Sequence, residues 1–296
     1  MRLFKQGKTN IVFDLIVYAI LLLLLIVIAY PLLIVVSSSF SSATAIMTGK
    51  VTFLPVDFTF DGYKAFFKYQ TIWRSIKNSV IYTAVGTIIN LVLTILAAYP
   101  LSRVDLRGRK YWTLLFLFTM WFTGGLIPTY LVVKDLKIIN TMWAMIIPNA
   151  LTVHYVIILR TAYEGLPEAL RESAYLDGCS DMQYLRKIAL PLTKASTAVI
   201  ALYYGVGHWN NYYNAKIYIT KDELAPLQTL LRKVILLSQT QELEMLMNEA
   251  IGTDAIASVE LLKYSSVVVS TIPILLVYPL VQRHLVKGVL IGAVKG

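Results

Sequence analysis

Six long apolar stretches recur along the sequence, at residues 11–36, 79–101, 111–133, 142–159, 195–213 and 265–281. Most of them approach or exceed the ~20 residues that a helix needs to cross the hydrocarbon core of a bilayer. Lipid offers no hydrogen-bond partner to backbone groups, so a spanning segment must be a helix or part of a closed barrel. The stretches lack the alternation of barrel strands. We therefore predict an all-α, polytopic membrane protein with six transmembrane helices.

Composition supports this class. The 296 residues are 57% hydrophobic and 15% charged, with a mean hydropathy of +0.65, which is too apolar for an ordinary soluble domain. The first stretch follows a basic start, so a cleaved signal peptide is an alternative, but such signals have apolar regions of only ~7–15 residues. We expect a retained helix. The single cysteine, Cys179, excludes an internal disulfide.

Basic residues predict the orientation. They gather in the N-terminal tail, after the second and fourth stretches, and at the C-terminus: Arg2, Lys5, Lys8, Arg103, Arg107, Arg109, Lys110, Arg171, Arg186, Lys187, Lys194, Arg283, Lys287 and Lys295. With six spans these fall on one side, which the positive-inside rule makes cytoplasmic. Both termini are then cytoplasmic, residues 161–194 form a cytoplasmic loop, and 37–77 and 214–263 are outside loops of one domain, 1–296. Because topology accounts for the net charge of +10, we expect no nucleic-acid partner.

Helix breakers interrupt several of the stretches: Pro31, Pro100, Pro128 beside Gly124 and Gly125, Pro148, Pro273 and Pro279. In a membrane, a broken helix persists only where protein or water satisfies the freed backbone groups. We therefore expect kinks or breaks, with helix packing as the ordinary role of any one of them.

The cytoplasmic segment 164–191 is more structured than a connector requires. Pro167 is suited to opening a helix, and Asp177-Gly178 is a stop signal in which glycine can adopt positive φ. Ser180 or Asp181 can cap a second helix through Ile188. Pro191 is expected to break the chain before the fifth span. Such short helices are marginal alone, so neighbours or a partner protein must hold them.

The same segment resembles a known family. Its residues run Glu172-Ser173-Ala174, three residues, Gly178, nine residues, then Ile188-Ala189-Leu190-Pro191. This resembles the EAA signature of ABC importer permeases at the same spacing, with serine at position 173 where alanine is usual. The resemblance implies the type I importer permease fold and a loop that docks on an ATPase. The coupling residues it implies are Glu168, Glu172, Ser173, Ala174, Asp177, Gly178, Ile188, Leu190 and Pro191. An amphipathic helix resting on the membrane surface is the alternative.

The resemblance also implies partners. In such importers a second homologous permease, two ATPase subunits and an external substrate-binding protein complete a complex in the bacterial cytoplasmic membrane. Residues 55–63 and Asn78-Ser79 resemble carbohydrate-type permeases related to the smaller membrane subunit of the maltose importer. Residues 209–215 and 225–231 resemble the branch that imports alginate and rhamnogalacturonan fragments. The implied cargo is therefore an oligosaccharide, in some cases acidic, and the alternative is a non-sugar solute.

Rings and amides crowd the end of the fifth stretch: Tyr204, His208, Trp209, Asn210, Asn211, Tyr213 and Asn214. Sugars present both apolar C–H faces and hydroxyl edges, which such side chains match. These residues are candidates for a substrate path. An aromatic belt at the membrane interface is an equal alternative.

The outside loop after this stretch is too large to be a simple connector. Resemblance implies that its residues Pro226, Leu227, Gln228 and Thr229 contact the binding protein, and a solvated lid packed on the spans is the alternative.

Other functional classes lack their residues. There is no glycine-rich phosphate loop ending in Gly-Lys-Ser/Thr, so ATP and Mg²⁺ are expected on a separate ATPase and no cofactor on this chain. No nucleophile, paired-carboxylate or metal-ligand spacing is present, so neither enzyme activity nor a metal is expected. His154 and His208 are better explained as neutral histidines within the bundle. A secondary transporter or channel remains the rival class, although the spans lack the repeats and ionisable residues typical of one.

Overall fold

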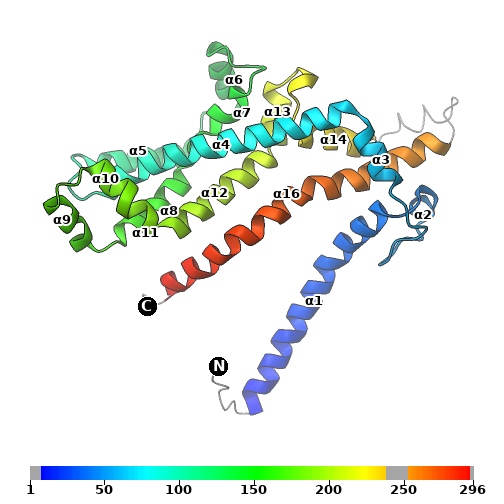
Figure 1. The fold of residues 1–296 in the computed structure, drawn as a ribbon, viewed down its shortest axis with the longest axis horizontal. Coiled ribbons are helices and arrows are strands. Elements are labelled where there is room, and N and C mark those ends of the chain that lie inside the picture. The colour runs from blue at the N-terminus through cyan, green and yellow to red at the C-terminus, as the bar shows by residue number, and fades with distance from the viewer. Residues whose placement is uncertain (1–7, 238–252, 294–296) are drawn as a thin grey trace. The chain divides into compact units, whose positions relative to one another are not determined.

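The computed structural model describes residues 8–237 and 253–293, which form helices, turns and short connections without a β-strand (Figure 1). The elements are α1 Lys8–Ser39, α2 Ala43–Met47, α3 Asp61–Lys68, α4 Gln70–Ser102, α5 Arg109–Trp121, α6 Leu126–Asp135, α7 Trp143–Ile146, η1 Ile147–Asn149, α8 Val153–Glu164, α9 Glu168–Leu176, α10 Asp181–Tyr184, η2 Leu185–Ala189, α11 Leu190–Leu192, α12 Lys194–Trp209, α13 Tyr212–Tyr218, η3 Asp222–Leu224, α14 Leu227–Leu237 and α16 Thr253–Ala293. The predicted all-α class is confirmed.

Three segments are long and apolar enough to cross a bilayer: Val12–Ser39, Gln70–Ser102 and Val259–Pro279. Two bent pairs, Arg109–Trp121 with Leu126–Asp135 and Trp143–Asn149 with Val153–Glu164, qualify only if each pair is one span. The described residues thus hold three candidate spans, or up to five. The stretch expected at 195–213 is divided by a turn into α13 and the 16-residue α12. Six spans and cytoplasmic termini therefore stay predictions.

Glycine and proline account for the two bends. Helices α5 and α6 meet at 111°, and Gly125, which caps α6, has a φ of 82° that few other residues adopt. The second bend, of 58°, follows η1, which contains Pro148. The interruptions expected near Pro128 and Pro148 are confirmed, and each of the two apolar stretches, 111–133 and 142–159, is a bent pair of helical segments. The other four prolines named above lie inside α1, α4 and α16.

Helix α4 shows how an apolar span packs within the protein. Its buried residues recur every three or four positions: Ile72, Ser75, Ser79, Tyr82, Gly86, Asn90, Thr94, Ala98, Tyr99 and Leu101. This spacing marks one face of a helix. Many of these residues are small or polar, which lets neighbouring helices approach and bond to them. Helices α8 and α12 pack against α4.

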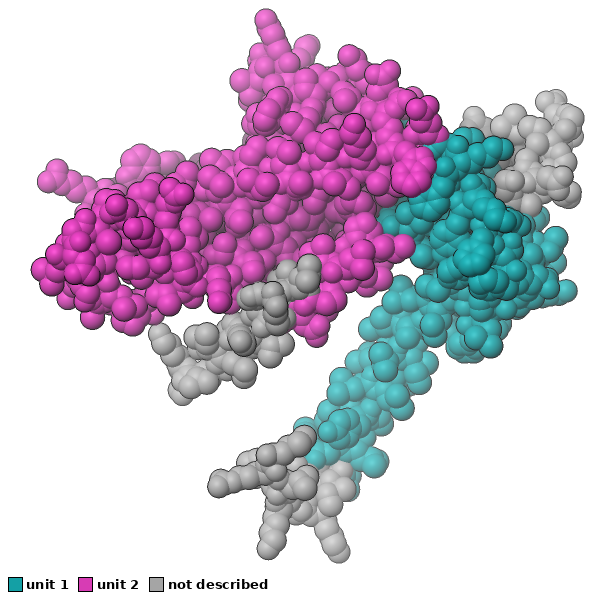
Figure 2. Space-filling view, viewed as in Figure 1, with its two compact units in different colours: residues 1–69, 231–270 teal, residues 70–230, 271–296 magenta. Residues whose placement is uncertain are grey.

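The chain divides into two compact units (Figure 2). One comprises residues 1–69 and 231–270, and in it Phe40 packs against the rings of Phe58, Phe60 and Tyr63. The other, residues 70–230 and 271–296, contains the candidate site. The single-domain boundary stays a prediction. Residues 238–252 of the outside loop, the N-terminal residues before Lys8, and Lys295 lie outside the described residues.

Candidate functional site

Helix α9 begins the segment that was predicted to dock on an ATPase. Pro167 caps it with φ −59° and ψ 129°, where its missing N–H costs nothing. Glu168 lies in the first turn, at the positive end of the helix dipole, and pairs with Arg171. Glu172 and Ser173 are exposed. The exposed face of the helix is mixed in character, because Leu170 and Leu176 are exposed on it as well.

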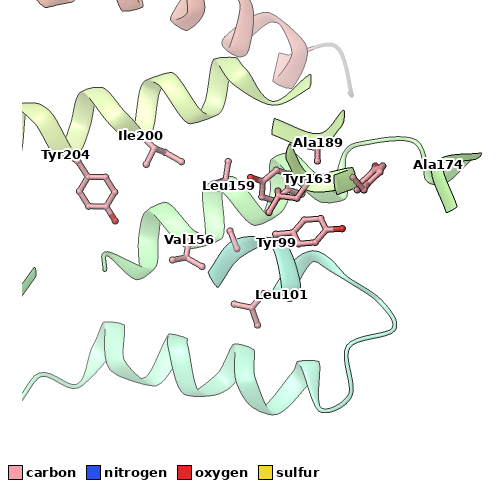
Figure 3. Close-up of a cluster of buried hydrophobic side chains, with 12 residues drawn as sticks. Tyr99, Leu101, Val156, Leu159, Tyr163, Ala174, Ala189, Ile200 and Tyr204 are labelled. Atoms are coloured by element: carbon pink, nitrogen blue, oxygen red, sulfur yellow. The ribbon is translucent and has the colours of Figure 1, made fainter. Parts of the chain in front are cut away.

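The next residue of the signature, Ala174, points inward and is 4% exposed. It belongs to a cluster of buried side chains from α4, α8, α10, η2 and α12, including Tyr99, Leu159, Tyr184 and Ala189 (Figure 3). A nine-residue helix is marginal alone, so this contact anchors it to the bundle. The small side chain at position 174 is what lets α9 approach the core.

The predicted stop at Asp177-Gly178 is confirmed. Asp177 is the C-cap of α9, and Gly178 has a φ of 78°. The Gly178 N–H donates to the Tyr175 carbonyl at 3.0 Å and the Cys179 N–H donates to the Ala174 carbonyl at 2.9 Å. This pair of bonds is the Schellman motif, which satisfies the last carbonyls of a helix and favours glycine at its left-handed position. The turn is therefore built around Gly178.

A second helix follows, as predicted, but it is not uniform. Ser180 caps it, and Ser180 and Gln183 form a capping box. After α10 the chain makes a π-helical turn, η2, and then continues through α11 to α12. The break expected at Pro191 falls two residues later: Pro191 itself lies inside α11, where the wider π turn before it accommodates the missing N–H, and the chain turns at Thr193 before α12 begins. Ile188 and Leu190 are half-buried and pack against the core cluster, while Pro191 is exposed.

Polar side chains join this segment to the end of α4. Asp181 Oδ1 accepts hydrogen bonds from the Tyr99 hydroxyl at 3.1 Å and the Tyr175 hydroxyl at 2.5 Å. Arg103 Nη2 donates to the Tyr175 hydroxyl at 3.0 Å. From the sequence, Asp181 was named only as a possible cap and Arg103 only as a cytoplasmic basic residue, and Tyr99 and Tyr175 were missed, because the bonds to α4 join residues far apart in the chain.

Ion pairs surround the same end of the bundle. Glu164, at the end of α8, pairs with Arg109 of α5 and with Arg160, whose Nε lies 2.9 Å from Glu164 Oε1. Arg171 Nη1 also lies 3.4 Å from Asp105 Oδ1. Exposed pairs of this kind contribute little individually, on the order of 0–1 kcal/mol. Together they fix the ends of α5, α8 and α9 beside one another.

Two of the predicted path residues, Tyr204 and His208, lie against α4. The Tyr204 hydroxyl is 2.7 Å from Thr94 Oγ1 and accepts from the Thr152 N–H at 3.1 Å. His208 Nε2 lies 3.1 Å from Asn90 Nδ2, which donates to the Asn149 carbonyl at 3.1 Å. These bonds satisfy backbone groups at the break before α8, as a membrane interior requires.

Asn90 and Thr94 were missed by sequence reasoning, although a signal was present. Both are polar residues inside an apolar span, four positions apart and therefore on one helix face. Polar residues in such spans usually face a neighbouring helix or a cavity. Here both are almost fully buried, at 1% and 0% exposed.

The remaining path residues divide between interior and surface. Trp209 is 6% exposed and Asn214 is 9% exposed, whereas Tyr213 is 61% exposed and Asn210 is also exposed. The Asn211 side chain caps α13 by accepting from the Asn214 N–H. The seven predicted path residues therefore do not form one continuous surface.

Trp209 lines a cavity of about 470 Å³. Its other walls come from α4, α12 and α16 and are apolar apart from Thr83 and Thr87. Both of those hydroxyl oxygens are buried without a hydrogen-bond partner. Such a lining offers a saccharide few polar groups.

The four residues expected to meet a binding protein follow η3. Pro226 and Leu227 are buried, and Gln228 and Thr229 are half-buried. The Leu227 N–H donates to Ser79 Oγ at 2.8 Å, and Gln228 Nε2 donates to Asn210 Oδ1 at 3.2 Å. The segment is therefore fastened to α4, and its predicted contact with a partner stays a prediction.

Within the described residues, no group of three or more His, Cys, Asp and Glu side chains is placed to hold a metal ion.

No family model matches the chain. The polygalacturonan/rhamnogalacturonan transport system permease protein YtcP of Bacillus subtilis (strain 168) is 38% identical over 287 residues, which cover 97% of this chain and 99% of that protein. Protein LplC of the same strain is also 38% identical, over 289 residues covering 98% and 97%.

A solved structure gives the same answer at the level of the fold. A chain of a bacterial ABC transporter involved in the import of the acidic polysaccharide alginate superposes with a TM-score of 0.84 at 29% identity, covering 96% of this chain and 99% of that one. A chain from the bacterial alginate ABC transporter in complex with an alginate pentasaccharide-bound periplasmic protein matches in fold alone, with a TM-score of 0.60 at 15% identity. Because it is 38% identical to two relatives over nearly its whole length, this chain belongs to the permease family of bacterial sugar ABC importers.

Proposed function

We propose that this chain is one of two permease subunits of an ATP-driven importer for acidic oligosaccharides of the pectin or alginate type. The main support for this substrate class is the 38% identity, over 97% of the chain, to a polygalacturonan/rhamnogalacturonan permease. The 0.84 TM-score to a chain of an alginate importer supports the same class. Alginate is an acidic polysaccharide, and the galacturonate units of polygalacturonan and rhamnogalacturonan carry carboxylates.

The proposed mechanism is alternating access. A binding protein delivers the saccharide outside, closure of two ATPase subunits pushes the coupling segments of the two permeases, and the bundle opens to the cytoplasm. ATP and Mg²⁺ are held by the ATPase, and this chain carries no catalytic residue or cofactor. Six spans with both termini in the cytoplasm would place segment 161–194 on the ATPase side.

The exposed face of α9, with polar side chains as well as Leu170 and Leu176, supports the docking role. Glu172 and Ser173 are exposed there, while Ala174 is anchored in the bundle. A partner that grips the outer face therefore acts on a helix fixed to the transmembrane core. The signature residues after the turn, Ile188 and Leu190, support the segment from inside.

Selection for acidic cargo has to come largely from the partners. The predicted path residues of this chain supply hydroxyl, amide, imidazole and indole groups, and none of the seven is Lys or Arg. Of these, Asn210 and Tyr213 are exposed and Tyr204 and His208 are engaged within the bundle. We propose that Asn210 and Tyr213 contact the sugar rings, with the carboxylates bound by the binding protein or the second permease.

The test is uptake into proteoliposomes that contain both permeases, the ATPase subunits and the binding protein. Oligogalacturonides are compared with the same oligomers reduced to neutral galactose units. We expect uptake to require both internal ATP and the binding protein, and to favour the acidic oligomer. Uptake driven by a proton or sodium gradient without the ATPase would contradict the importer mechanism. Preference for the neutral oligomer would contradict the proposal that the substrate is an acidic oligosaccharide.

A further inference from the structure

Four side chains join the coupling segment to the end of α4. Tyr175 comes from α9 and Asp181 from α10, so both helices of the segment contribute. Tyr99 and Arg103 come from the last turn of α4 and the residue just beyond it. One carboxylate oxygen of Asp181 accepts both tyrosine hydroxyls, and the Tyr175 hydroxyl accepts from Arg103 in turn. The result is a continuous hydrogen-bonded chain, Tyr99–Asp181–Tyr175–Arg103.

Other charged groups near these four hydrogen-bonded residues form ion pairs at the solvent-exposed surface. Asp105 lies 3.5 Å from Arg103 and 3.4 Å from Arg171, but its side chain is 67% exposed, so these pairs are screened by solvent. Glu168 pairs with Arg171 and is 60% exposed. Asp181 is exposed as well, but it and Arg103 make directed hydrogen bonds to the two tyrosine hydroxyls rather than ion pairs alone. These bonds tie both helices of the segment to α4.

The protonation of Tyr175 fits its place in the chain. Burial raises the pKa of its hydroxyl, the hydrogen bond to Asp181 raises it further, and the hydrogen bond from Arg103 lowers it. The net shift is upward, so the hydroxyl keeps its proton at neutral pH. It can then donate to Asp181 while accepting from Arg103.

The geometry also decides where a push on the segment can go. Helices α9 and α10 have 9 and 4 residues and cannot hold their shape alone. Helix α4 has 33 residues and is therefore roughly 50 Å long. A displacement delivered to the end of such a helix is carried along its length.

We propose that Tyr175, Asp181 and Arg103 are positioning residues that transmit movement of the coupling segment to α4. This rests on the proposed docking of the segment on an ATPase. Ala174 and the Gly178 turn hold the segment in shape, whereas the Tyr175–Asp181–Arg103 chain passes its movement on. Loss of the chain should uncouple hydrolysis from transport without releasing the ATPase.

The experiment compares Tyr175→Phe, Asp181→Asn and the double variant in proteoliposomes of the complete complex. ATP hydrolysis and sugar uptake are measured in the same vesicles, and the ATPase that co-purifies is quantified. Tyr111→Phe is the matched control, because this tyrosine is 77% exposed on α5. We expect uptake per ATP to fall about fivefold in Tyr175→Phe, as loss of a hydrogen bond of about 1 kcal/mol would give, with ATPase binding and hydrolysis unchanged.

The double variant makes the test sharper. If the residues act as one chain, it should be no more uncoupled than the worse single variant. Wild-type uptake per ATP in Tyr175→Phe, multiplied effects in the double variant, or loss of the ATPase during purification would each overturn the proposal. Gly178→Val, measured in the same assay, distinguishes failure of the transmission role from failure of the docking role. If it impairs uptake while Tyr175→Phe does not, only the transmission role fails; if both behave as wild type, the docking role fails as well.

Discussion

Helix α4 holds a loop segment at each end, and the two attachments differ in chemistry. Near its start, Asn78 and Tyr82 donate to the carbonyls of Glu223 and Leu224 at 2.8 and 2.9 Å, and Ser79 accepts from the Leu227 N–H. Every partner on that segment is a backbone atom. At the other end, Tyr99 and Arg103 bond to the side chains of Asp181 and Tyr175.

The two attachments should respond differently to substitutions in the segments that they hold. Backbone partners are present whatever the side chains of residues 223–227 are, so that segment stays fixed while its sequence varies. The attachment of the coupling segment depends on particular side chains and on charge. A single substitution, or a shift in its surroundings, can loosen it. A fixed segment near the start of α4 and a responsive one near its end suit the proposed role of a permease that receives cargo at one site and a mechanical signal at another.

The largest effect is expected midway between the two ends, at Gly86. A Cβ there would lie 2.5 Å from the His208 ring, so either this ring would have to leave its place beside Asn90 or α4 and α12 would have to move apart. Gly86→Val should destabilise the permease by about 1–3 kcal/mol, as overpacking does, and disturb both attachments together. The measurement is hydrogen exchange of residues 172–185 and 223–230, with the melting temperature in detergent.

Gly207→Val is the matched control, because a Cβ at Gly207 meets nothing within 4 Å. Equal melting temperatures for the two variants would show that α4 and α12 do not need this close approach. Faster exchange at only one end would show that α4 does not join the two attachments.

A comparable but local effect is expected near the start of α4. Ser79→Ala leaves the buried Leu227 N–H without its acceptor, which should cost about 1–3 kcal/mol. Hydrogen exchange should quicken in residues 223–230 and stay unchanged in 172–185. Tyr175→Phe should give the reverse pattern. If each variant quickens both segments equally, the two attachments are not independent.

The smallest effect separates the attachments by charge. Raising the ionic strength from 0.1 to 1 M shortens the Debye length from about 10 to about 3 Å. Exchange in residues 172–185 should quicken slightly, by under 1 kcal/mol of local stability, because Arg103, Asp181 and Arg171 help to hold them. Residues 223–227 are held by neutral groups and should not respond. A larger response to salt in residues 223–227 than in residues 172–185 would contradict this difference in charge between the two attachments.

Local features of the site could be predicted from sequence, because their causes are local. The Gly178 turn and the Ser180 cap follow from residues within a few positions of one another. The bond between Tyr99 and Asp181 joins residues 82 positions apart, and a single sequence does not report such a pairing.

The spans were predicted with similar limits. Hydropathy identified α1, α4 and α16, which are apolar over their length. It did not anticipate the 111° bend between α5 and α6, because average hydropathy is blind to the direction of the chain. The π turn before Pro191 was also missed, since it depends on how α11 is held against the core rather than on the identity of the proline.

The segment around Gly178 is proposed to couple ATP hydrolysis to transport, and Gly178→Val is the decisive variant. Gly178 has a φ of 78° with no atom within 4 Å of an added Cβ, so valine would strain only the backbone, by about 1–2 kcal/mol. Gly165→Val is the control, because Gly165 has a φ of −75° and its Cβ contacts are ordinary. We predict that ATP-driven uptake falls about fivefold or more in Gly178→Val alone, with the complex intact in the membrane. Unchanged uptake in that variant would contradict the account.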